Sequence, residues 1–344
     1  MSLLEFTGDS IGVHRLNEIS YPPVRKNCMT PIRSALVTGA TGFIGSALVR
    51  KLVSQGVQTC ALVRNLNGAI QESLYGAEVI ASRTTDVKDL KSCLDGRTYE
   101  VAFHLAAAGV SRGIQSPESI ISGNVSFTTN LLLVTKEWNL KRFVYTGSAF
   151  EYGDTGRQQP IDESTPLRPR SLYAAAKAAA SQCGEILAKE LQIPFANLRM
   201  FGVYGVGESS QRLIPYLIQC LSQNSFANLS HGKQIRDMLY IDDVVAAIIA
   251  TGECDRLPVS GVYNVCSSVP VNIREIAGEV VKKIQSSERL LKWGANTAPD
   301  VEARYIVGAN TKITTLTDWR PSISLTAGIE RMVSFYTPAR QHTA

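Results

Sequence analysis

The sequence contains no apolar run of the roughly 20 residues that a membrane-spanning helix requires, so we expect no membrane partner. Its seven cysteines are dispersed and include no Cys-x-x-Cys pair, which predicts neither a disulfide framework nor a zinc site, and we expect no bound metal. The net charge of +5 is small and scattered, so it does not indicate nucleic-acid binding and suits an anionic small ligand. The N-terminal segment has no signal-peptide apolar region, and we expect a cytoplasmic protein.

A glycine-rich segment at residues 39–45 joins an apolar run at residues 34–37 to a stretch whose apolar residues have helical spacing. Gly39 permits a tight turn, Gly42 lets a pyrophosphate approach the backbone, and Gly45 lets the helix pack on the strand. Free N–H groups at the start of a helix attract phosphate. This strand–turn–helix context predicts a dinucleotide site. Its expected contacts are Gly39, Thr41, Gly42, Phe43, Ile44 and Gly45.

Three polar residues further along the chain form a candidate acid–base group. Tyr173 and Lys177 lie four residues apart in an alanine-rich segment that predicts a helix, so their side chains share one face. A free tyrosine has a pKa of about 10. A nearby ammonium group lowers that pKa, and we expect Lys177 to do so for Tyr173. Ser148, at the end of the predicted strand 142–148, can hydrogen-bond the same substrate oxygen.

The spacing Gly-x-x-Gly-x-x-Gly, the order Ser148…Tyr173-x-x-x-Lys177 and the segments 198–205 and 236–244 together resemble the extended short-chain dehydrogenase/reductase family. That family includes sugar-nucleotide epimerases and dehydratases, and the resemblance covers about residues 33–336. It implies an α/β fold, with a Rossmann-type doubly wound parallel sheet and a smaller C-terminal α/β lobe. It also implies a homodimer formed through helices at 124–138 and 171–191.

The resemblance divides the chain into four parts. These are an N-terminal extension at 1–32, a dinucleotide-binding domain at 33–204 to which 232–262 partly return, a nucleotide-sugar lobe at 205–336, and a tail at 337–344. Asp242 and Asp243 precede a helical run at 244–251, which predicts N-capping and not metal binding. Gly202 stands where the family usually has an asparagine that touches the substrate.

The end of the second predicted strand favours NADP(H) over NAD(H). Arg64 stands where an acidic residue would bind the ribose hydroxyl of NAD, and an arginine there accommodates the 2′-phosphate of NADP. His104, inside an apolar strand, is predicted to be a core residue, and Asn124 matches a family position that supports the turn after that strand. The further cofactor contacts that the resemblance implies are Asp86, Val87, Leu105, Ala106, Ala107, Thr146, Tyr173, Lys177, Phe201 and Val203.

The two residues after Ser148 argue against sugar dehydration. Dehydratases of the family carry an Asp-Glu pair there, whereas this sequence has Ala149 and Phe150. Glu151 is displaced by one residue, which in an extended segment turns it to the other face. We therefore predict an oxidoreductase, an NADPH-dependent 4-ketoreductase of a nucleotide-linked 4-keto-6-deoxysugar. A nucleotide-sugar 4-epimerase and a catalytically silent NADP-binding sensor or scaffold remain alternatives. The expected substrate contacts are Ala108, Ser148, Ala149, Phe150, Tyr173, Arg212 and Arg236, the last assigned to the diphosphate.

Overall fold

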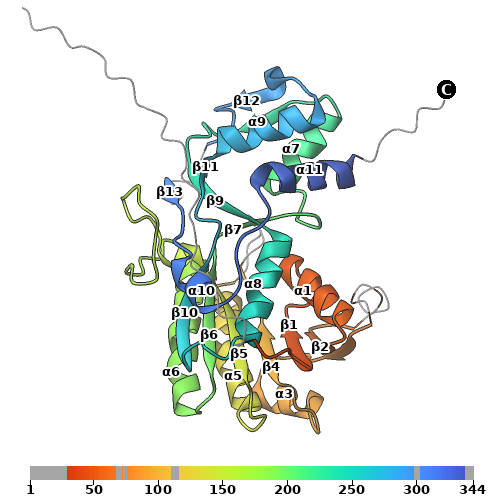
Figure 1. Cartoon of the computed structure of the whole chain (residues 1–344), viewed down its shortest axis with the longest axis vertical. Helices are drawn as coiled ribbons and strands as arrows, with labels where there is room; N and C mark the ends of the chain where they lie inside the picture. The colour runs from red at the N-terminus through yellow and green to blue at the C-terminus, as the bar shows by residue number, and fades with distance from the viewer. Residues whose placement is uncertain are drawn as a thin grey trace, which may run out of the picture.

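Seven parallel strands form the central sheet, in the spatial order β10 (Ser260–Val265), β6 (Phe195–Met200), β5 (Arg142–Ser148), β4 (Val101–His104), β1 (Ser34–Thr38), β2 (Gln58–Val63) and β3 (Glu78–Ala81) (Figure 1). The computed structural model describes residues 29–66, 72, 74, 76–109, 116–297 and 303–337. Starting at β1, the chain adds β2 and β3 toward one edge of the sheet. It then crosses back and adds β4, β5, β6 and β10 toward the other edge, so the strand order reverses between β1 and β4. Ligands of such sheets bind outside the carboxyl ends of the strands at this switch point. The predicted doubly wound parallel sheet is confirmed.

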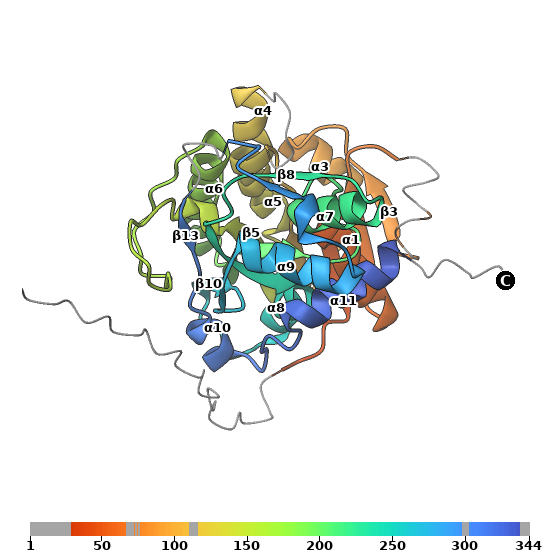
Figure 2. The same cartoon turned by 90° about the horizontal axis from the view of Figure 1, so that it is seen from above.

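Helices cover both faces of the sheet (Figure 2). Such double cover buries the inner strands on both faces, and all seven residues of β5 are buried. Neighbouring residues of β1 point to opposite cores, Val37 to the first and Leu36 to the second. The first core lies under α1 (Phe43–Ser54) and α8 (Ile241–Glu253), and the second under α3 (Val87–Cys93), α5 (Phe127–Thr135) and α6 (Leu172–Glu190).

Of the two helices predicted to form the dimer interface, one has its predicted bounds and the other begins and ends elsewhere. The helix expected at 171–191 is observed as α6, with Ser171 as its N-cap. The helix expected at 124–138 begins earlier, at α4 (Pro117–Ile121), passes through a π-helical turn (Ser122–Ser126) and ends with α5 at Thr135. Ser116 caps α4 by accepting a hydrogen bond from the backbone N–H of Ser119, and Pro117 occupies the first helical turn. The Ser-Pro pair before residue 124 is the start signal that the prediction lacked.

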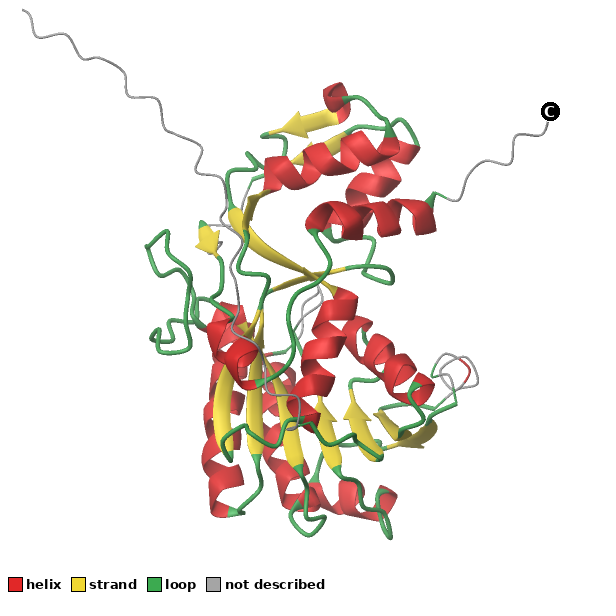
Figure 3. Cartoon of the chain, viewed as in Figure 1, coloured by secondary structure: helices red, strands yellow, loops and turns green. Residues whose placement is uncertain are grey.

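A second group of elements lies above the carboxyl edge of the central sheet (Figures 1 and 3). In it β9 pairs with β7, β11 and β13, and β8 pairs with β12. The chain leaves this group after β9, because α8 packs on α1 and β10 pairs with β6. The elements are β7 (Gly202–Tyr204), α7 (Leu213–Ser222), β8 (Ala227–Leu229), β9 (Ile235–Tyr240), β11 (Pro270–Asn272), α9 (Ile273–Ile284), β12 (Leu291–Trp293), β13 (Tyr305–Ile306) and α11 (Leu325–Tyr336); α10 (Thr311–Leu316) follows β13.

Asp242 and Asp243 lie in the first turn of α8 and do not cap it, so the N-capping prediction is wrong. The N-cap is Tyr240, and no side-chain cap is made there. Asp243 instead accepts hydrogen bonds from the backbone N–H groups of Ser322 and Ile323, which ties the C-terminal segment to α8. Asp242 forms an ion pair with Arg331 at 3.1 Å. The start of α8 is thus used to anchor α11.

The predicted extension at 1–32 and tail at 337–344 lie largely outside the described residues. Met29 forms an antiparallel bridge with Cys254, and Ile32 is buried in the core, so residues 29–32 belong to the folded body. No helix in the described ranges combines the length and apolar character needed to cross a lipid bilayer.

Candidate active site

The glycine loop forms the expected turn between β1 and α1. Gly39 has a φ of +68°, and a Cβ there would lie 2.6 Å from the backbone nitrogen of Ala106 at the exit of β4. A Cβ on Gly45 would lie 2.0 Å from the carbonyl oxygen of Gly39. Only glycine fits either position. Gly42 is the N-cap of α1 and supplies no side-chain acceptor, and Thr41 and Gly42 are exposed. The backbone N–H groups at the start of α1 can therefore receive a phosphate, with Phe43 and Ile44 half-buried beside them.

The three candidate acid–base residues come together from two elements. Ser148 is the last residue of β5, and Tyr173 and Lys177 lie one turn apart at the start of α6. A hydrogen bond joins Tyr173 to Ser148. The Tyr173 ring lies beside the exit of β4, because a Cβ on Gly109 would be 3.3 Å from its Cδ2 atom. The serine hydroxyl and the phenol thus face the carboxyl ends of β4 and β5.

The charges around Tyr173 differ from the expected ones. Burial raises the pKa of Tyr173 to about 12, the hydrogen bond with Ser148 lowers it, the Glu151 charge raises it, and Arg212 lowers it. Lys177 is not among these groups, and the expected effect of its charge on Tyr173 stays a prediction. The Lys177 ammonium is turned inward, with Nζ 4.3 Å from the centre of the Tyr145 ring. Burial lowers the pKa of Lys177 to about 8, and the Glu151 charge opposes that shift.

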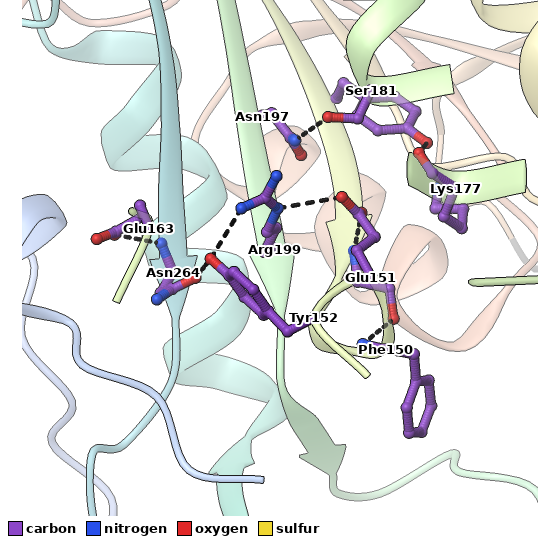
Figure 4. Close-up of polar contacts among 11 residues, drawn as sticks. Phe150, Glu151, Tyr152, Glu163, Lys177, Ser181, Asn197, Arg199 and Asn264 are labelled. Carbon is purple, nitrogen blue, oxygen red and sulfur yellow. Dashed lines mark hydrogen bonds and ion pairs between the residues drawn. The ribbon is translucent and has the colours of Figure 1, made fainter. Parts of the chain in front are cut away.

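A buried polar network runs through Glu151, Arg199, Tyr152 and Asn264 (Figure 4). The Glu151 carboxylate accepts a hydrogen bond from the backbone N–H of Ser148 at 2.7 Å, and it pairs with the Arg199 guanidinium at 3.1 Å. Arg199 also donates to the Tyr152 hydroxyl at 2.9 Å, and that hydroxyl donates to Asn264 at 2.8 Å. Desolvation raises the pKa of Glu151, and the Arg199 charge opposes the rise.

The expected extended conformation of the segment after Ser148 is also wrong. Residues Ala149–Glu151 form a 3₁₀ turn, with Ser148 as its N-cap. This turn points the Glu151 side chain toward Arg199 and the Phe150 side chain away from it (Figure 4). Ala149 is buried, and Phe150 is 53% exposed. Two apolar side chains and an inward carboxylate therefore follow Ser148.

The residues predicted to bind the adenosine side of the cofactor follow β2 and β3. Arg64 is exposed directly after β2. Asp86 is the N-cap of α3, which begins at Val87, and its carboxylate accepts from the backbone N–H of Asp89. Thr84 also donates to that carboxylate, and these hydrogen bonds lower the pKa of Asp86.

Small residues follow β4, and the side-chain amide of Asn124 supports the turn that they form. The backbone N–H of Ala106 donates to Thr38, and Asn124 donates to the carbonyl of Ala108 at 3.0 Å. Asn124 thus supports the turn after β4 as the resemblance implied. Leu105 and Ala106 are half-buried there, and Ala107 is exposed.

The core prediction for His104 is confirmed. Its ring hydrogen-bonds Thr38 at 2.7 Å and Thr128 at 3.0 Å and is fully buried. Burial and the Lys177 charge lower the pKa of His104 to about 3, so the imidazole is neutral at physiological pH. The nearby Thr146 donates to the carbonyl of His104 and is also buried.

The remaining predicted contacts lie after β6. The Phe201 side chain is buried beside Tyr152, and its backbone N–H donates to the carbonyl of Val265. Val203 is half-buried in β7. A Cβ on Gly202 would lie 2.5 Å from the carbonyl oxygen of Asp237, which explains the glycine that replaces the family asparagine.

The two predicted substrate arginines have different surroundings. Arg212 is the exposed N-cap of α7, and its Nε lies 3.7 Å from Glu208. Its positive charge opposes the raised pKa of Tyr173. Arg236 is half-buried in β9 and donates from one nitrogen to the carbonyls of Ile235 and Ala303, at 2.9 and 3.0 Å. Of the two predicted substrate arginines, Arg212 is the one whose charge acts on Tyr173, whereas Arg236 donates to backbone carbonyls.

Two acidic groups near the site were not predicted. Arg199 lies in β6, whose six residues are all buried, and a buried charge requires a partner of opposite charge. This requirement is the sequence signal that could have identified Glu151. Glu208 had no comparable signal. Its side chain is 8% exposed, and burial raises its pKa to about 7 against the opposing charge of Arg212.

Comparisons with known proteins match this fold and site. The model of the family described as "NAD dependent epimerase/dehydratase family" matches residues 35–266. Protein CapI of Staphylococcus aureus is 27% identical in an alignment 332 residues long, which covers 88% of this chain and 97% of the relative.

Two solved structures show the same fold. UDP-glucose 4-epimerase of Thermotoga maritima, solved with UDP-glucose, matches with a TM-score of 0.80 at 21% identity over 88% of this chain and 98% of that one. A dTDP-glucose 4,6-dehydratase of Bacillus anthracis, solved in complex with NAD, matches with a TM-score of 0.77 at 22% identity over 88% and 96%.

Proposed function

Because the chain belongs to the NAD-dependent epimerase/dehydratase family, we propose that it is a reductase that converts the 4-keto group of a nucleotide-linked 6-deoxysugar to a hydroxyl at the expense of NADPH. The family acts on sugar nucleotides with a nicotinamide cofactor. The choice among its reactions depends on which acid and base groups this chain places beside Ser148 and Tyr173.

The observation that carries the proposal is the turn after β5. Sugar 4,6-dehydration needs an acid and a base in addition to the Ser–Tyr pair, and the family supplies them from the two residues after the serine. Here those residues are the buried Ala149 and the apolar Phe150. The next carboxylate, Glu151, is fully buried and engaged by Ser148 and Arg199. This chain therefore favours simple carbonyl reduction over dehydration.

The site residues fit a nicotinamide dinucleotide. The N–H groups of α1 that carry no side-chain cap would hold its pyrophosphate, and the glycines leave room for it. When bound, NADPH supplies the hydride that adds to the C4 carbonyl carbon. Tyr173, protonated because its pKa is about 12, gives its proton to the carbonyl oxygen. Ser148 donates a hydrogen bond to the same oxygen and stabilises its developing charge.

The proposed preference for NADPH rests on Arg64, which is exposed at the end of β2. An arginine at this position can bind a 2′-phosphate, whereas an acidic residue there serves NAD. The Bacillus anthracis dehydratase was solved with NAD. A structural match at 22% identity concerns the fold alone. We therefore base the proposed cofactor preference on the residues of this chain.

A 4-epimerase is the second candidate, because the Ser–Tyr pair that reduces a ketone can also oxidise an alcohol. The two reactions differ in cofactor use. We would incubate the protein with NADPH and a panel of nucleotide-linked 4-ketosugars and follow the loss of NADPH absorbance. The proposal predicts one NADPH consumed per sugar reduced, and Tyr173→Phe should abolish it. Interconversion of nucleotide sugars without net NADPH loss would identify an epimerase instead.

A further inference from the structure

We propose that Glu208 is a further binding residue of the candidate site, whose buried carboxylate accepts a hydrogen bond from a sugar hydroxyl of a bound nucleotide. That nucleotide is the ligand of the proposed function, on which the inference therefore rests. Glu208 takes no step in the reaction, so measurements of binding test its role.

Glu208 carries a buried carboxylate that the protein does not fully pair. Its side chain is 8% exposed, and Oε2 is closed to solvent and finds no donor among the described residues. The Nε atom of Arg212 lies 3.7 Å from Oε1, which is too long for a hydrogen bond. A buried acceptor without a donor costs folding free energy, and a donor supplied by a ligand removes that cost.

The segment that carries Glu208 lies against the start of α1. Gly207 has a φ of +92°, and a Cβ there would lie 3.9 Å from the Cδ2 atom of Phe43. Phe43 is the first residue of α1, whose N–H groups without a side-chain cap are proposed to hold the pyrophosphate. Four residues after Glu208 comes Arg212, whose positive charge opposes the raised pKa of Tyr173. One end of the segment thus contacts the phosphate-binding end of α1, and the charge at its other end acts on the acid–base group.

Contacts with α11 and α8 hold this segment in place. The Tyr336 hydroxyl, at the end of α11, accepts a hydrogen bond from the backbone N–H of Gly207 at 2.9 Å. The backbone N–H of Glu208 donates to the carbonyl of Gly205 at 3.2 Å. A Cβ on Gly205 would lie 2.4 Å from the Cγ2 atom of Ile241 at the start of α8, so only glycine fits there. Backbone contacts therefore place the carboxylate, and a change of the Glu208 side chain leaves them intact.

The chemistry of the carboxylate selects the kind of group that it binds. An ionised carboxylate only accepts hydrogen bonds, and phosphate oxygens are acceptors as well, so the pyrophosphate itself is not the partner. The donors of a nucleotide that lie next to its phosphates are the hydroxyls of its riboses and, in a nucleotide sugar, of the hexose. Cofactor and substrate both carry such hydroxyls, and separate titrations distinguish the two sources.

The test compares wild type with Glu208→Ala and Glu208→Gln at pH 8, with NADPH, UDP-glucose and dTDP-glucose titrated separately by isothermal calorimetry. A hydrogen bond to a charged acceptor contributes roughly 10- to 150-fold in affinity, and Glu208→Ala should lose that factor. Glu208→Gln keeps a neutral acceptor, worth roughly 2- to 12-fold, and should therefore bind more tightly than Glu208→Ala.

Glu253→Ala is the matched control. Glu253 is half-buried, and burial raises its pKa as it does that of Glu208. Its backbone carbonyl accepts from Lys141, directly before β5, whereas Ser148 ends that strand, so Glu253 lies at the opposite end of the sheet from the site. The control variant should bind every ligand as wild type does.

Denaturant unfolding of the ligand-free protein separates a binding role from a structural one. Burial raises the pKa of Glu208 to about 7, so at pH 8 the folded protein holds a largely ionised carboxylate that burial disfavours. Glu208→Gln removes this charge, and its unfolding midpoint at pH 8 should equal or exceed that of wild type. A residue with a merely structural role would lose stability and affinity together.

Weaker binding of NADPH alone in Glu208→Ala assigns the hydroxyl to a ribose of the cofactor, and weaker binding of a nucleotide sugar alone assigns it to the substrate. Either result, with the unfolding midpoint of Glu208→Gln retained, supports the inference. Unchanged affinities for all three ligands, an equal loss in Glu253→Ala, or a lowered midpoint in Glu208→Gln overturns it. Weakened binding in Glu208→Ala, when the wild type reduces no nucleotide-linked 4-ketosugar, would keep the inference and reject the proposed reductase.

Discussion

Arg199 and Glu151 form an ion pair inside the protein, with Nε 3.1 Å from Oε2 and side-chain exposures of 6% and 0%. Removing one member of such a pair leaves the other charge buried without a partner. The pair lies beneath Ser148, so the stability of the sheet and the geometry of the site depend on the same two residues.

Replacement of Arg199 by methionine should lower the free energy of unfolding by about 3–5 kcal/mol at neutral pH, because it strands the Glu151 carboxylate. Denaturant unfolding of wild type and variant measures the difference. Arg256→Met is the control, since the Arg256–Asp318 pair lies at the surface, and its loss should cost at most about 1 kcal/mol.

The cost of Arg199→Met should shrink in acid. The pKa of Glu151 is already raised in the folded protein, and loss of the Arg199 charge raises it further. The stability contributed by the protonated form is fully present below the unfolded pKa and is lost as pH rises through the folded pKa. The difference between wild type and variant should therefore be smaller at about pH 5 than at about pH 8. A difference independent of pH would contradict a buried, uncompensated carboxylate.

Tyr173→Phe should reduce kcat by about 10²–10⁴-fold, because the phenol is the proposed proton donor. Cofactor affinity should change little, since phenylalanine keeps the ring of this expected cofactor contact and removes only its hydroxyl. Steady-state kinetics and a fluorescence titration with NADPH measure the two quantities. Tyr216→Phe provides the control, because that hydroxyl accepts from the backbone N–H of Asn228 and takes no part in the site. Undiminished turnover in Tyr173→Phe would exclude it as the acid.

Arg64→Asp should reverse the cofactor preference. A charge-assisted hydrogen bond to the 2′-phosphate is worth roughly 1.5–3 kcal/mol, which is about 10- to 150-fold in affinity. Wild type should therefore bind NADPH more tightly than NADH, and added salt should weaken the preference because Arg64 is exposed. Titration of both cofactors tests this, with Arg289→Asp in the other part of the molecule as control. Equal affinities of the wild type for NADPH and NADH would show that Arg64 does not bind the 2′-phosphate.

The homodimer through α5 and α6 also stays a prediction, and the surface of α6 makes it specific. Its exposed stripe contains Ala175, Ala179, Cys183 and Ile186, and Ile186 is 62% exposed. Small residues allow another helix to approach closely. Ile186→Lys should therefore convert a dimer into a monomer in light scattering, whereas Val259→Lys, at a similarly exposed apolar side chain, should not. A wild-type monomer at micromolar concentration would refute the interface.

The parts of the fold that could be predicted have strong local signals. The glycine loop needs glycine at positions 39 and 45 for steric reasons that hold in any context, and the alanine-rich run 172–180 forms a helix by its own propensity. The break between α4 and α5 was missed because a π-helical turn at Ser122–Ser126 has no comparable sequence signal.

The errors at the site have one cause, which is that side-chain direction depends on the tertiary structure. Lys177 shares a helix face with Tyr173, yet its four-carbon stem carries the ammonium inward over Tyr145. Glu151 follows Ser148 in a 3₁₀ turn and not in an extended strand. The alternation of side chains between the two faces of a strand therefore does not apply to it. Asp243 was predicted to cap α8, but its carboxylate accepts a hydrogen bond from the backbone N–H of Ser322, which is 79 residues away in the sequence.

The most direct test of the proposed reductase follows the hydride itself. The protein would be incubated with a nucleotide-linked 4-keto-6-deoxysugar and NADPH carrying deuterium at the transferred position, and the sugar product analysed by mass spectrometry and NMR. The account predicts one deuterium at C4 of each product molecule, one NADP⁺ formed per product, and no such product from Tyr173→Phe. Product formed without deuterium at C4, or sugar interconverted with NADPH unchanged, would contradict it.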